Sequence, residues 1–208
     1  MLIKPIETIY NGYRFRSRLE ARWAVFFDAA GIKYQYEPEG FDLDAEYYLP
    51  DFYLPEFYLY IEIKPLNREI FHHVGDGNEW EKKCSKFRDL TGNAILLCYG
   101  DPYEMIYHRL FAYDHADSSG GDSEFDCVFT EHDDKPVLVA YSDMKDLSVC
   151  INENMLTSNR IGTSYEFSRD LYLLWDKATS KENYVGGNII SLARLKARQA
   201  RFEHGECG

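Results

Sequence analysis

The segment "LPDFYLPEFYLYIEIKP", residues 49–65, places Asp51, Glu62 and Lys64 among aromatic and aliphatic residues that favour β-strands. Charged side chains weaken a packed sheet unless a partner compensates for their burial. The segment therefore predicts a β-hairpin whose charged positions have a chemical role.

The alternation of side chains along a strand separates the charged residues of this segment from its apolar ones. Glu62 and Lys64 lie two residues apart and share one face of the second strand. Ile61 and Ile63 point to the other, buried face. The pattern therefore predicts that an acid and a base lie side by side on one face of the hairpin.

A short loop would bring two acidic residues together. If residues 55–58 form a four-residue loop, Leu54 faces Leu59 and Asp51 faces Glu62 across the hairpin. Directly opposed side chains have Cβ atoms roughly 4.5–5.5 Å apart. Two carboxylates at that distance repel each other, and one of them takes up a proton unless a cation lies between them.

A divalent metal ion is the cation that fits this pair. Mg²⁺, for which Mn²⁺ can substitute, prefers hard oxygen ligands and is commonly bound by one or two carboxylates together with a substrate phosphate. Lys64 cannot be a ligand, but it can hold the attacking water or offset the negative charge that builds on the phosphate. The hairpin therefore predicts a metal site at Asp51 and Glu62 and the cleavage of phosphodiester bonds.

A purely structural interpretation of the same residues stays open. The sequences Asp-Phe-Tyr and Glu-Ile-Lys could form one polar face of an exposed hairpin, with Glu62 and Lys64 as a simple ion pair. Motifs of this length recur by accident. The Pro50–Asp51 start, the short spacing and the apolar surroundings favour the catalytic interpretation.

An amphipathic helix is predicted upstream of the hairpin, over residues 17–30. Ser17 is a favourable N-cap, and Gly31 is a favourable terminator. The apolar residues that fall on one face at helical spacing are Leu19, Trp23, Phe26, Phe27 and Ala30.

Further elements complete an α/β or α+β core in about the first 100 residues. The alternation of apolar and polar residues predicts a half-buried strand over 32–38, and a continuous apolar run predicts a buried strand over 93–102. The remaining predicted elements are hairpin strands over 51–54 and 58–63 and a helix over 79–90.

The second half of the chain has a different pattern. A Gly/Ser/Asp-rich loop over 114–126 precedes a hairpin over 127–142, whose turn is expected at Asp133, Asp134 and Lys135. Helices are predicted over 164–178 and 188–202. Two organisations stay open: residues 1–102 form the core and 103–208 an extension, or the later elements extend the same sheet.

Pro50–Asp51 and Glu62–Ile63–Lys64, in this order and spacing, resemble the signature of the PD-(D/E)XK nuclease superfamily. The resemblance covers about residues 13–100, including "FRSRLEARWAVFFDAAGIKYQYEPEGF". Within the superfamily, the chain resembles the branch that contains archaeal-type Holliday-junction resolvases, very-short-patch-type nucleases and endonuclease subunits of heteromeric transposases. It also resembles small phage-encoded proteins of the superfamily. It implies a restriction-endonuclease-like α/β core, a central mixed sheet flanked by helices, here with a C-terminal α+β extension. It also implies Mg²⁺-dependent cleavage of DNA.

The resemblance further implies that an acidic residue on the first helix joins the site. Glu20 matches that position, so Glu20 becomes a candidate catalytic residue and a third metal ligand beside Asp51 and Glu62. A structural alternative is equally specific: Ser17 to Glu20 reads S-x-x-E, a capping box in which Glu20 would reach back to the Ser17 amide.

Basic residues cluster at both ends of an otherwise acidic chain. The net charge is −12, which is unfavourable for binding nucleic acid, but residues 1–33 and 194–201 are rich in Arg and Lys. A second interpretation, that these residues form solvated faces or balance the protein's own carboxylates, stays open. The candidate DNA contacts are Arg14, Arg16, Arg18, Lys82, Lys86, Arg194 and Arg198.

Composition excludes several other classes of protein. The chain of 208 residues has no apolar run long enough to span a bilayer, and "MLIKPIETIY" lacks the pattern of a signal peptide. Five scattered cysteines without a C-x-x-C pair indicate neither a zinc site nor a disulfide framework. A cytoplasmic protein is expected, in the host cytoplasm if a phage encodes it.

Three functions remain as hypotheses. The first is a metal-dependent endodeoxyribonuclease, structure-specific or engaged in phage or mobile-element DNA processing, which could act as a homodimer. The second is a silent nuclease fold that serves as a scaffold for a protein partner, bound through the C-terminal extension. The third is an inhibitor whose acidic surface mimics DNA.

Overall fold

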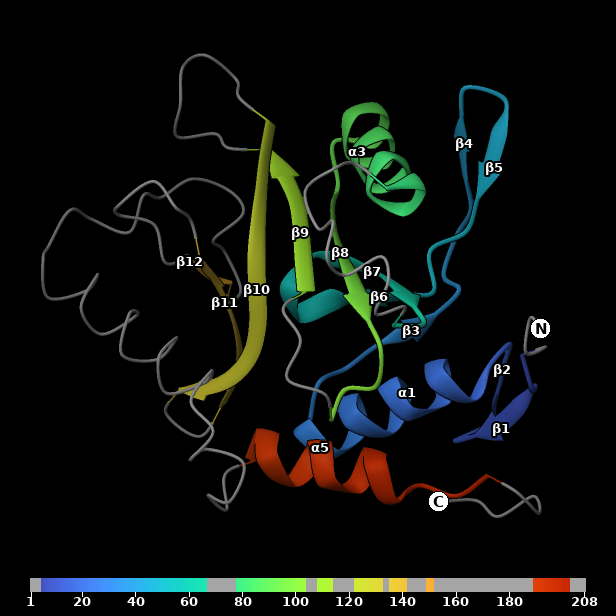
Figure 1. The fold of residues 1–208 in the computed structure, drawn as a ribbon, viewed down its shortest axis with the longest axis vertical. Helices are drawn as coiled ribbons and strands as arrows, with labels where there is room; N and C mark the ends of the chain where they lie inside the picture. Colours follow the sequence, from blue (N-terminus) through green and yellow to red (C-terminus); the bar gives the residue numbers. More distant parts are fainter. Residues whose placement is uncertain are drawn as a thin grey trace, which may run out of the picture.

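The computed structural model describes residues 5–66, 78–103, 108–113, 122–132, 135–141, 149–151 and 189–202. These residues form a mixed α/β structure in which a sheet lies between helices (Figure 1). The predicted helix over 164–178 and the predicted turn residues Asp133 and Asp134 lie outside the described residues.

The described strands form one mixed sheet of eight strands in the order β12-β11-β10-β9-β8-β7-β6-β3. Only β7 and β8 pair in parallel; the other neighbours within the described sheet are antiparallel. Strands from both sides of residue 102 therefore share one sheet. Their bounds are β3 Gln35–Tyr36, β6 Phe52–Leu54, β7 Leu59–Lys64, β8 Ala94–Tyr99, β9 His108–Tyr113, β10 Asp122–His132, β11 Lys135–Tyr141 and β12 Val149–Ile151.

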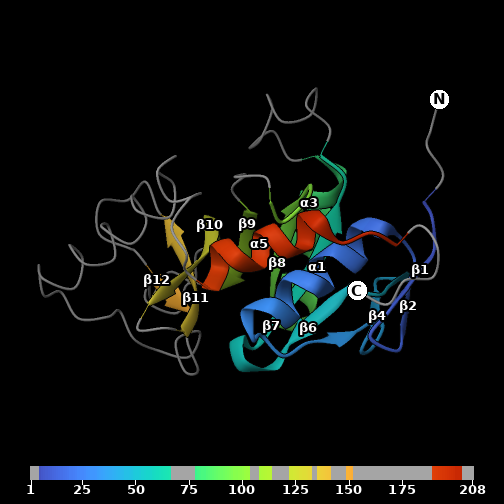
Figure 2. The same cartoon turned by 90° about the horizontal axis from the view of Figure 1, so that it is seen from below.

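Helices cover both faces of the sheet. The helices α1 (Arg18–Ala30) and α5 (Ile189–Gln199) pack side by side on one face, although they come from opposite ends of the chain (Figure 2). The helix α3 (Glu79–Thr91) packs on the other face. Two small hairpins complete the structure, β1 (Thr8–Tyr10) with β2 (Tyr13–Phe15) and β4 (Phe41–Leu43) with β5 (Glu46–Tyr48).

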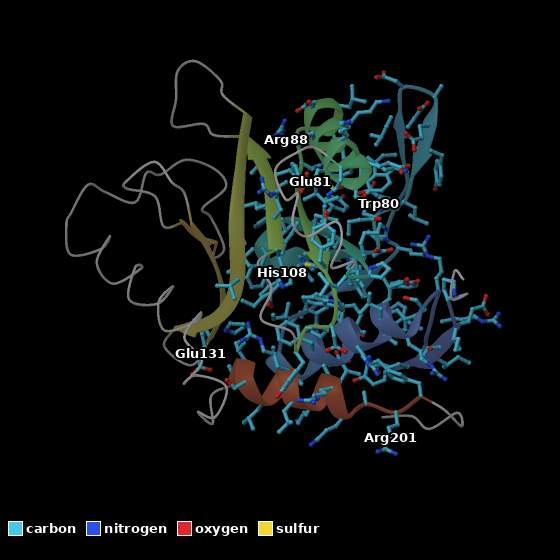
Figure 3. The ribbon with its side chains drawn as sticks, in the orientation of Figure 1. Trp80, Glu81, Arg88, His108, Glu131 and Arg201 are labelled. Carbon is cyan, nitrogen blue, oxygen red and sulfur yellow. The ribbon has the colours of Figure 1, made fainter. Side chains whose placement is uncertain are left out.

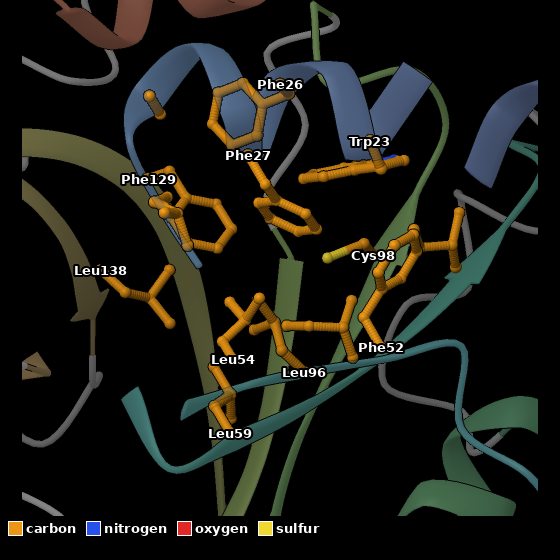
Figure 4. Close-up of a cluster of buried hydrophobic side chains, with 14 of the residues drawn as sticks. Trp23, Phe26, Phe27, Phe52, Leu54, Leu59, Leu96, Cys98, Phe129 and Leu138 are labelled. Atoms are coloured by element: carbon orange, nitrogen blue, oxygen red, sulfur yellow. The ribbon is translucent and has the colours of Figure 1, made fainter. Parts of the chain in front are cut away.

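The first helix is confirmed with its predicted ends. The Ser17 side chain caps it by accepting a hydrogen bond from the Glu20 amide, and Gly31 ends it in the left-handed conformation. The apolar stripe faces the sheet, where Trp23, Phe26 and Phe27 pack against strand residues such as Phe129 (Figure 4). This packing fixes the start of α1 above the hairpin.

Gly31→Ala is expected to lower the free energy of unfolding by about 1 kcal/mol, because a Cβ strains the left-handed conformation. The φ angle of Gly31 is 74° and no atom lies within 4 Å of an added Cβ, so the cost is conformational rather than steric. A chemical-denaturation curve measures it. Gly31→Asn is the control, since Asn tolerates this conformation better, and an equal loss in both variants would contradict the explanation.

The hairpin of β6 and β7 has the predicted register. Leu54 pairs with Leu59, and Phe52 pairs with Ile61; Asp51 comes directly before this ladder on one strand, and Glu62 directly after it on the other. A single turn of 3-10 helix, η1 (Pro55–Phe57), joins the strands.

The expectation that only one face of this hairpin is buried was wrong. Ile61 and Ile63 pack beneath α1, but Tyr60 and Glu62 are also buried, on the face that α3 covers. The strand β7 lies inside the sheet, between β6 and β8, where helices cover both faces. The acidic site is therefore enclosed rather than on an exposed hairpin.

Other differences concern individual strands of the sheet. The predicted strand over 32–38 is reduced to β3, and β9, which the sequence did not predict, links β8 to β10. The hairpin of β10 and β11 is confirmed, but β10 begins at Asp122, within the predicted loop over 114–126. Lys135, expected in the turn, is the first residue of β11 and pairs with His132. In the part of the chain that the structure describes, no helix is long and apolar enough to cross a membrane.

Candidate active site

Asp51 lies directly before β6, at the carboxyl end of the parallel pair β7 and β8, and is only 2% exposed. Its Oδ2 accepts a hydrogen bond of 2.7 Å from the Ile63 amide. Its Oδ1 forms a 2.6 Å ion pair with the Arg16 guanidinium. The backbone of β7 and a residue just before α1 therefore hold the two oxygens of this carboxylate.

Glu62 lies in the middle of the site, on the opposite strand, and is 3% exposed. One carboxylate oxygen forms an ion pair with Lys64, two residues further along β7. The other accepts a 2.8 Å hydrogen bond from the Tyr48 hydroxyl. Because Tyr48 ends β5, the small hairpin of β4 and β5 contributes a wall of the site.

Lys64 is the last residue of β7, and its ammonium group has two partners. Besides Glu62, it contacts the ring of Trp80, with Nζ 3.9 Å from the ring centroid. Trp80 stands in the first turn of α3, beside the N-cap Asn78 (Figure 3). The face of an aromatic ring attracts a cation, so Trp80 fixes the position of the ammonium group.

Glu20 lies in the first turn of α1 and is 8% exposed. Its carboxylate accepts hydrogen bonds from the Ser17 hydroxyl at 2.7 Å, the Tyr36 hydroxyl at 2.7 Å and the Arg16 amide at 3.1 Å. The capping-box expectation was thus right about the Ser17 cap and wrong about the amide, because the carboxylate reaches the Arg16 N–H rather than the Ser17 N–H. Glu20 tightens the turn that carries Arg16.

The electrostatics of the site are dominated by enclosed negative charge. Burial raises the pKa of Asp51 to about 8, and repulsion from Glu62 and Glu20 acts in the same direction. The Lys64 ammonium group and the hydrogen bond from the Ile63 amide lower the pKa of Asp51, but they offset the effect of burial only partly. A divalent cation would relieve the repulsion.

The donor set fits a hard divalent ion, with a smaller ligand set than the sequence predicted. Within the described ranges, no group of three or more His, Cys, Asp and Glu side chains is arranged to hold a metal ion. Glu20, Asp51 and Glu62 are therefore not gathered into one three-ligand cluster, because each carboxylate is turned toward its own hydrogen-bond and ion-pair partners. Mg²⁺ and Mn²⁺ need only one or two protein carboxylates, which Asp51 and Glu62 supply.

The basic residues near the first helix have different surroundings. Arg14 forms an exposed ion pair of 3.0 Å with Glu7. Arg18 is the first residue of α1 and is partly buried. Arg16, which is also a predicted DNA contact, lies on Asp51 and belongs to the site.

The basic residues of the other two helices mostly have structural contacts. Lys86 donates a 2.7 Å hydrogen bond to the Leu43 carbonyl and so fastens α3 to β4, whereas Lys82 is exposed. Arg194 donates to the Phe129 carbonyl at 2.9 Å, and the Arg198 guanidinium lies 4.1 Å from the Tyr103 ring centroid. Arg194 thus ties α5 to the sheet, as does Glu131, which accepts a hydrogen bond from the first amide of the helix (Figure 3).

Sequence reasoning missed Tyr48 and Trp80 as members of the site. Both contact the charged hairpin only through tertiary structure, Tyr48 from 14 positions upstream of Glu62 and Trp80 from a helix that follows it. Trp80 carried one usable signal: it follows Asn78, the N-cap that positions the first turn of α3.

Comparison with known proteins gives no match: no family model, no curated protein and no solved structure is similar enough to the chain to be identified as a relative.

Proposed function

We propose that this protein is a divalent-metal-dependent endodeoxyribonuclease with a restriction-endonuclease-like core of the PD-(D/E)XK type. The observation that carries the proposal is the enclosed pair of repelling carboxylates, Asp51 and Glu62, beside the ammonium group of Lys64. Burying two repelling acids beside a lysine lowers stability, and a metal-dependent hydrolase gives that arrangement a use.

In this proposal Asp51 and Glu62 hold Mg²⁺ or Mn²⁺. A bound ion would lower the pKa of an attacking water and neutralise the charge of the scissile phosphate. Lys64 orients that water or stabilises the negative charge on the phosphate, and Trp80 fixes the ammonium group. Glu20 holds the backbone of Arg16 in place and so acts on Asp51 indirectly, through the Arg16 side chain.

The proposed substrate is DNA, of a form set by surfaces outside the site, as in structure-specific or mobile-element processing. Basic residues at both ends of the chain would contact the phosphates against a net charge of −12. An exposed candidate such as Lys82 retains this role more readily than Lys86, Arg194 or Arg198, whose side chains are engaged within the protein.

A cleavage panel tests the proposed function. Purified protein is incubated with linear, nicked, branched and single-stranded DNA, each with Mg²⁺, with Mn²⁺ and with a chelator. Cleavage of at least one form with metal, and none with chelator, is expected. If every DNA form stays intact with both metals, the nuclease proposal is wrong.

Trp80→Leu is expected to lower kcat about tenfold, because the ammonium group loses its aromatic partner, an interaction of about 0.5–2 kcal/mol. Trp80→Phe keeps a ring and should lose less. Steady-state cleavage of the best substrate from the panel measures both. Equal activity of Trp80→Leu and the wild type would show that the ring does not position Lys64.

A silent scaffold remains the second candidate, and one observation favours it. Arg16 and Lys64 already pair with Asp51 and Glu62, so the acids have counter-ions without a metal. A calorimetric titration separates the candidates. If neither the free protein nor the protein bound to DNA takes up Mg²⁺ or Mn²⁺ at millimolar concentration, and Asp51→Asn does not change the titration, the scaffold is favoured.

A further inference from the structure

Arg16 bridges two acids at the edge of the site. Its Nη2 lies 2.6 Å from Asp51 Oδ1, and its Nε lies 2.7 Å from Glu37 Oε1. The exposed fractions of the side chains differ sharply: 54% for Arg16, 28% for Glu37 and 4% for Asp51. A water-facing cation thus reaches inward to a buried carboxylate.

The backbone of Arg16 is fixed while its side chain is held by ion pairs. The Arg16 amide donates to Glu20 Oε2 at 3.1 Å and to the Tyr36 hydroxyl at 3.0 Å. The guanidinium is bonded to Asp51 and Glu37, and both contacts are charge interactions. The side chain can therefore change partners without disturbing the start of α1.

Arg16 and a metal ion would compete for the same oxygen. Asp51 Oδ2 is occupied by the Ile63 amide, which leaves Oδ1, the atom that Arg16 holds, as the more available ligand. A guanidinium in contact with that oxygen also repels a dication through space. Arg16 therefore opposes the uptake of metal as long as it stays on Asp51.

We propose that Arg16 is a displaceable counter-ion, which lies on Asp51 in the metal-free protein and moves to a DNA phosphate when the site takes up a divalent ion. The inference rests on the proposed nuclease function and assigns a regulation to its site. A guanidinium suits both partners, since it binds carboxylate and phosphate through the same fork of N–H groups. Glu37, close to solvent, keeps the side chain at the mouth of the site during the exchange.

The exchange couples metal binding to DNA binding. Without DNA, displaced Arg16 has lost one partner, so metal binding is weakened. With DNA, the displaced guanidinium gains a phosphate, so each ligand strengthens the binding of the other by the same factor. The protein would then hold its metal firmly only where a substrate is present.

The first test is a calorimetric titration of Mn²⁺ into chelator-treated protein without DNA. Arg16→Ala should bind Mn²⁺ about tenfold more tightly than the wild type, because a unit charge next to the dication is removed. The variant keeps the backbone bonds of position 16. Arg14→Ala is the matched control: it removes the same charge two residues away, where Arg14 pairs with the exposed Glu7, and should bind like the wild type.

Each outcome of this titration has one meaning. If the wild type binds Mn²⁺ and Arg16→Ala binds equally or more weakly, the inference is overturned and the proposed function stands. If only Arg16→Ala binds Mn²⁺, the inference is supported in its strongest form. If neither binds at millimolar concentration, the metal site and the inference both fail.

The second test addresses the phosphate. DNA affinity is measured against salt concentration in a Lys64→Ala background, with a gel to confirm that the DNA stays intact. DNA affinity falls as salt rises, and the loss of one phosphate contact should make the slope of log affinity against log salt less steep by about one. Adding Arg16→Ala should make this slope less steep when Mn²⁺ is present and leave it unchanged when chelator is present. Equal slopes with Mn²⁺ would overturn the move to phosphate.

Discussion

Lys64→Ala is expected to lower the rate of DNA cleavage by about 10²–10⁴-fold, the usual contribution of a group that moves a proton or stabilises charge in the transition state. The ammonium group of Lys64, at the end of β7, lies beside Glu62, and the ring of Trp80 limits its movement. Single-turnover cleavage with saturating Mg²⁺ measures the change without a contribution from product release.

Two further variants separate the roles of Lys64 from an effect on folding. Lys64→Arg keeps the charge beside Glu62, so it should fold normally and retain part of the activity if Lys64 acts by charge alone. If Lys64 must hold a water, the cleavage rate of Lys64→Arg should be nearly as low as that of Lys64→Ala, because a planar guanidinium does not replace an ammonium group. Thermal melts of both variants check the fold.

The control for this experiment is Lys33→Ala, which removes an exposed lysine paired with Glu56 at 2.8 Å. Its activity should equal that of the wild type. Lys64→Ala that is folded and cleaves within about threefold of the wild type would be incompatible with a catalytic Lys64. The scaffold interpretation would then account better for the buried charges.

The parts of the site that lie within one hairpin could be predicted from the sequence. A four-residue connection and strict alternation fix which residues face each other, so the pairing of Leu54 with Leu59 followed, and with it the placement of Asp51 and Glu62 at the far end of the ladder. The caps of α1 at Ser17 and Gly31 are equally local. Local rules suffice here because each depends on a few consecutive residues.

The parts that depend on tertiary structure could not be predicted in this way. Polar residues at alternate positions of β7 suggest an exposed face, yet α3 buries that face with side chains from more than 20 positions away, such as Phe87. Arg16 shows the same limit: its side chain resembles a phosphate contact in sequence, and only the fold brings it to Asp51. The parallel pairing of β7 with β8 is likewise a long-range property, because the helix α3 lies between these strands in the chain.

The uneven charge of the protein becomes intelligible at this level. A net charge of −12 opposes DNA binding when it is spread over the whole chain. Much of the basic charge near the site is engaged with the protein's own acids, as Arg16 with Asp51 and Lys83 with Glu46. Ion pairs of this kind can be exchanged for phosphate, so net charge alone does not decide the partner.

Asp51→Asn is expected to raise the stability of the metal-free protein at alkaline pH, although it removes a proposed metal ligand. Burial and the neighbouring Glu62 raise the pKa of Asp51 to about 8, whereas an unfolded Asp has a pKa of about 3.9. Between these values the folded state binds a proton that the unfolded state has lost. The contribution of Asp51 to stability is therefore fully present below about pH 4 and is lost as the pH rises through about 8.

The variant removes this penalty because an amide carries no charge. The side-chain oxygen of the new amide can still accept the bond from the Ile63 N–H, which measures 2.7 Å in the wild type, while the partly exposed pair with Arg16 is lost. At pH 9 in chelator, the variant should be more stable by about 2 kcal/mol, and its melting temperature higher by several degrees. Denaturation curves at pH 5, 7 and 9 should show that the free energy of unfolding declines less with rising pH for the variant than for the wild type.

Metal should reverse the order of stability, and the reversal links the penalty to function. Saturating Mn²⁺ stabilises a folded protein that binds it, so it should raise the melting temperature of the wild type and leave Asp51→Asn unchanged. Asp44→Asn is the matched control: Asp44 is 71% exposed and has a φ angle of 51°, which Asn tolerates, so this variant should follow the wild type throughout. A parallel decline of wild type and Asp51→Asn from pH 5 to 9 would mean that Asp51 carries no such penalty, and the electrostatic reason for a metal at this position would be lost.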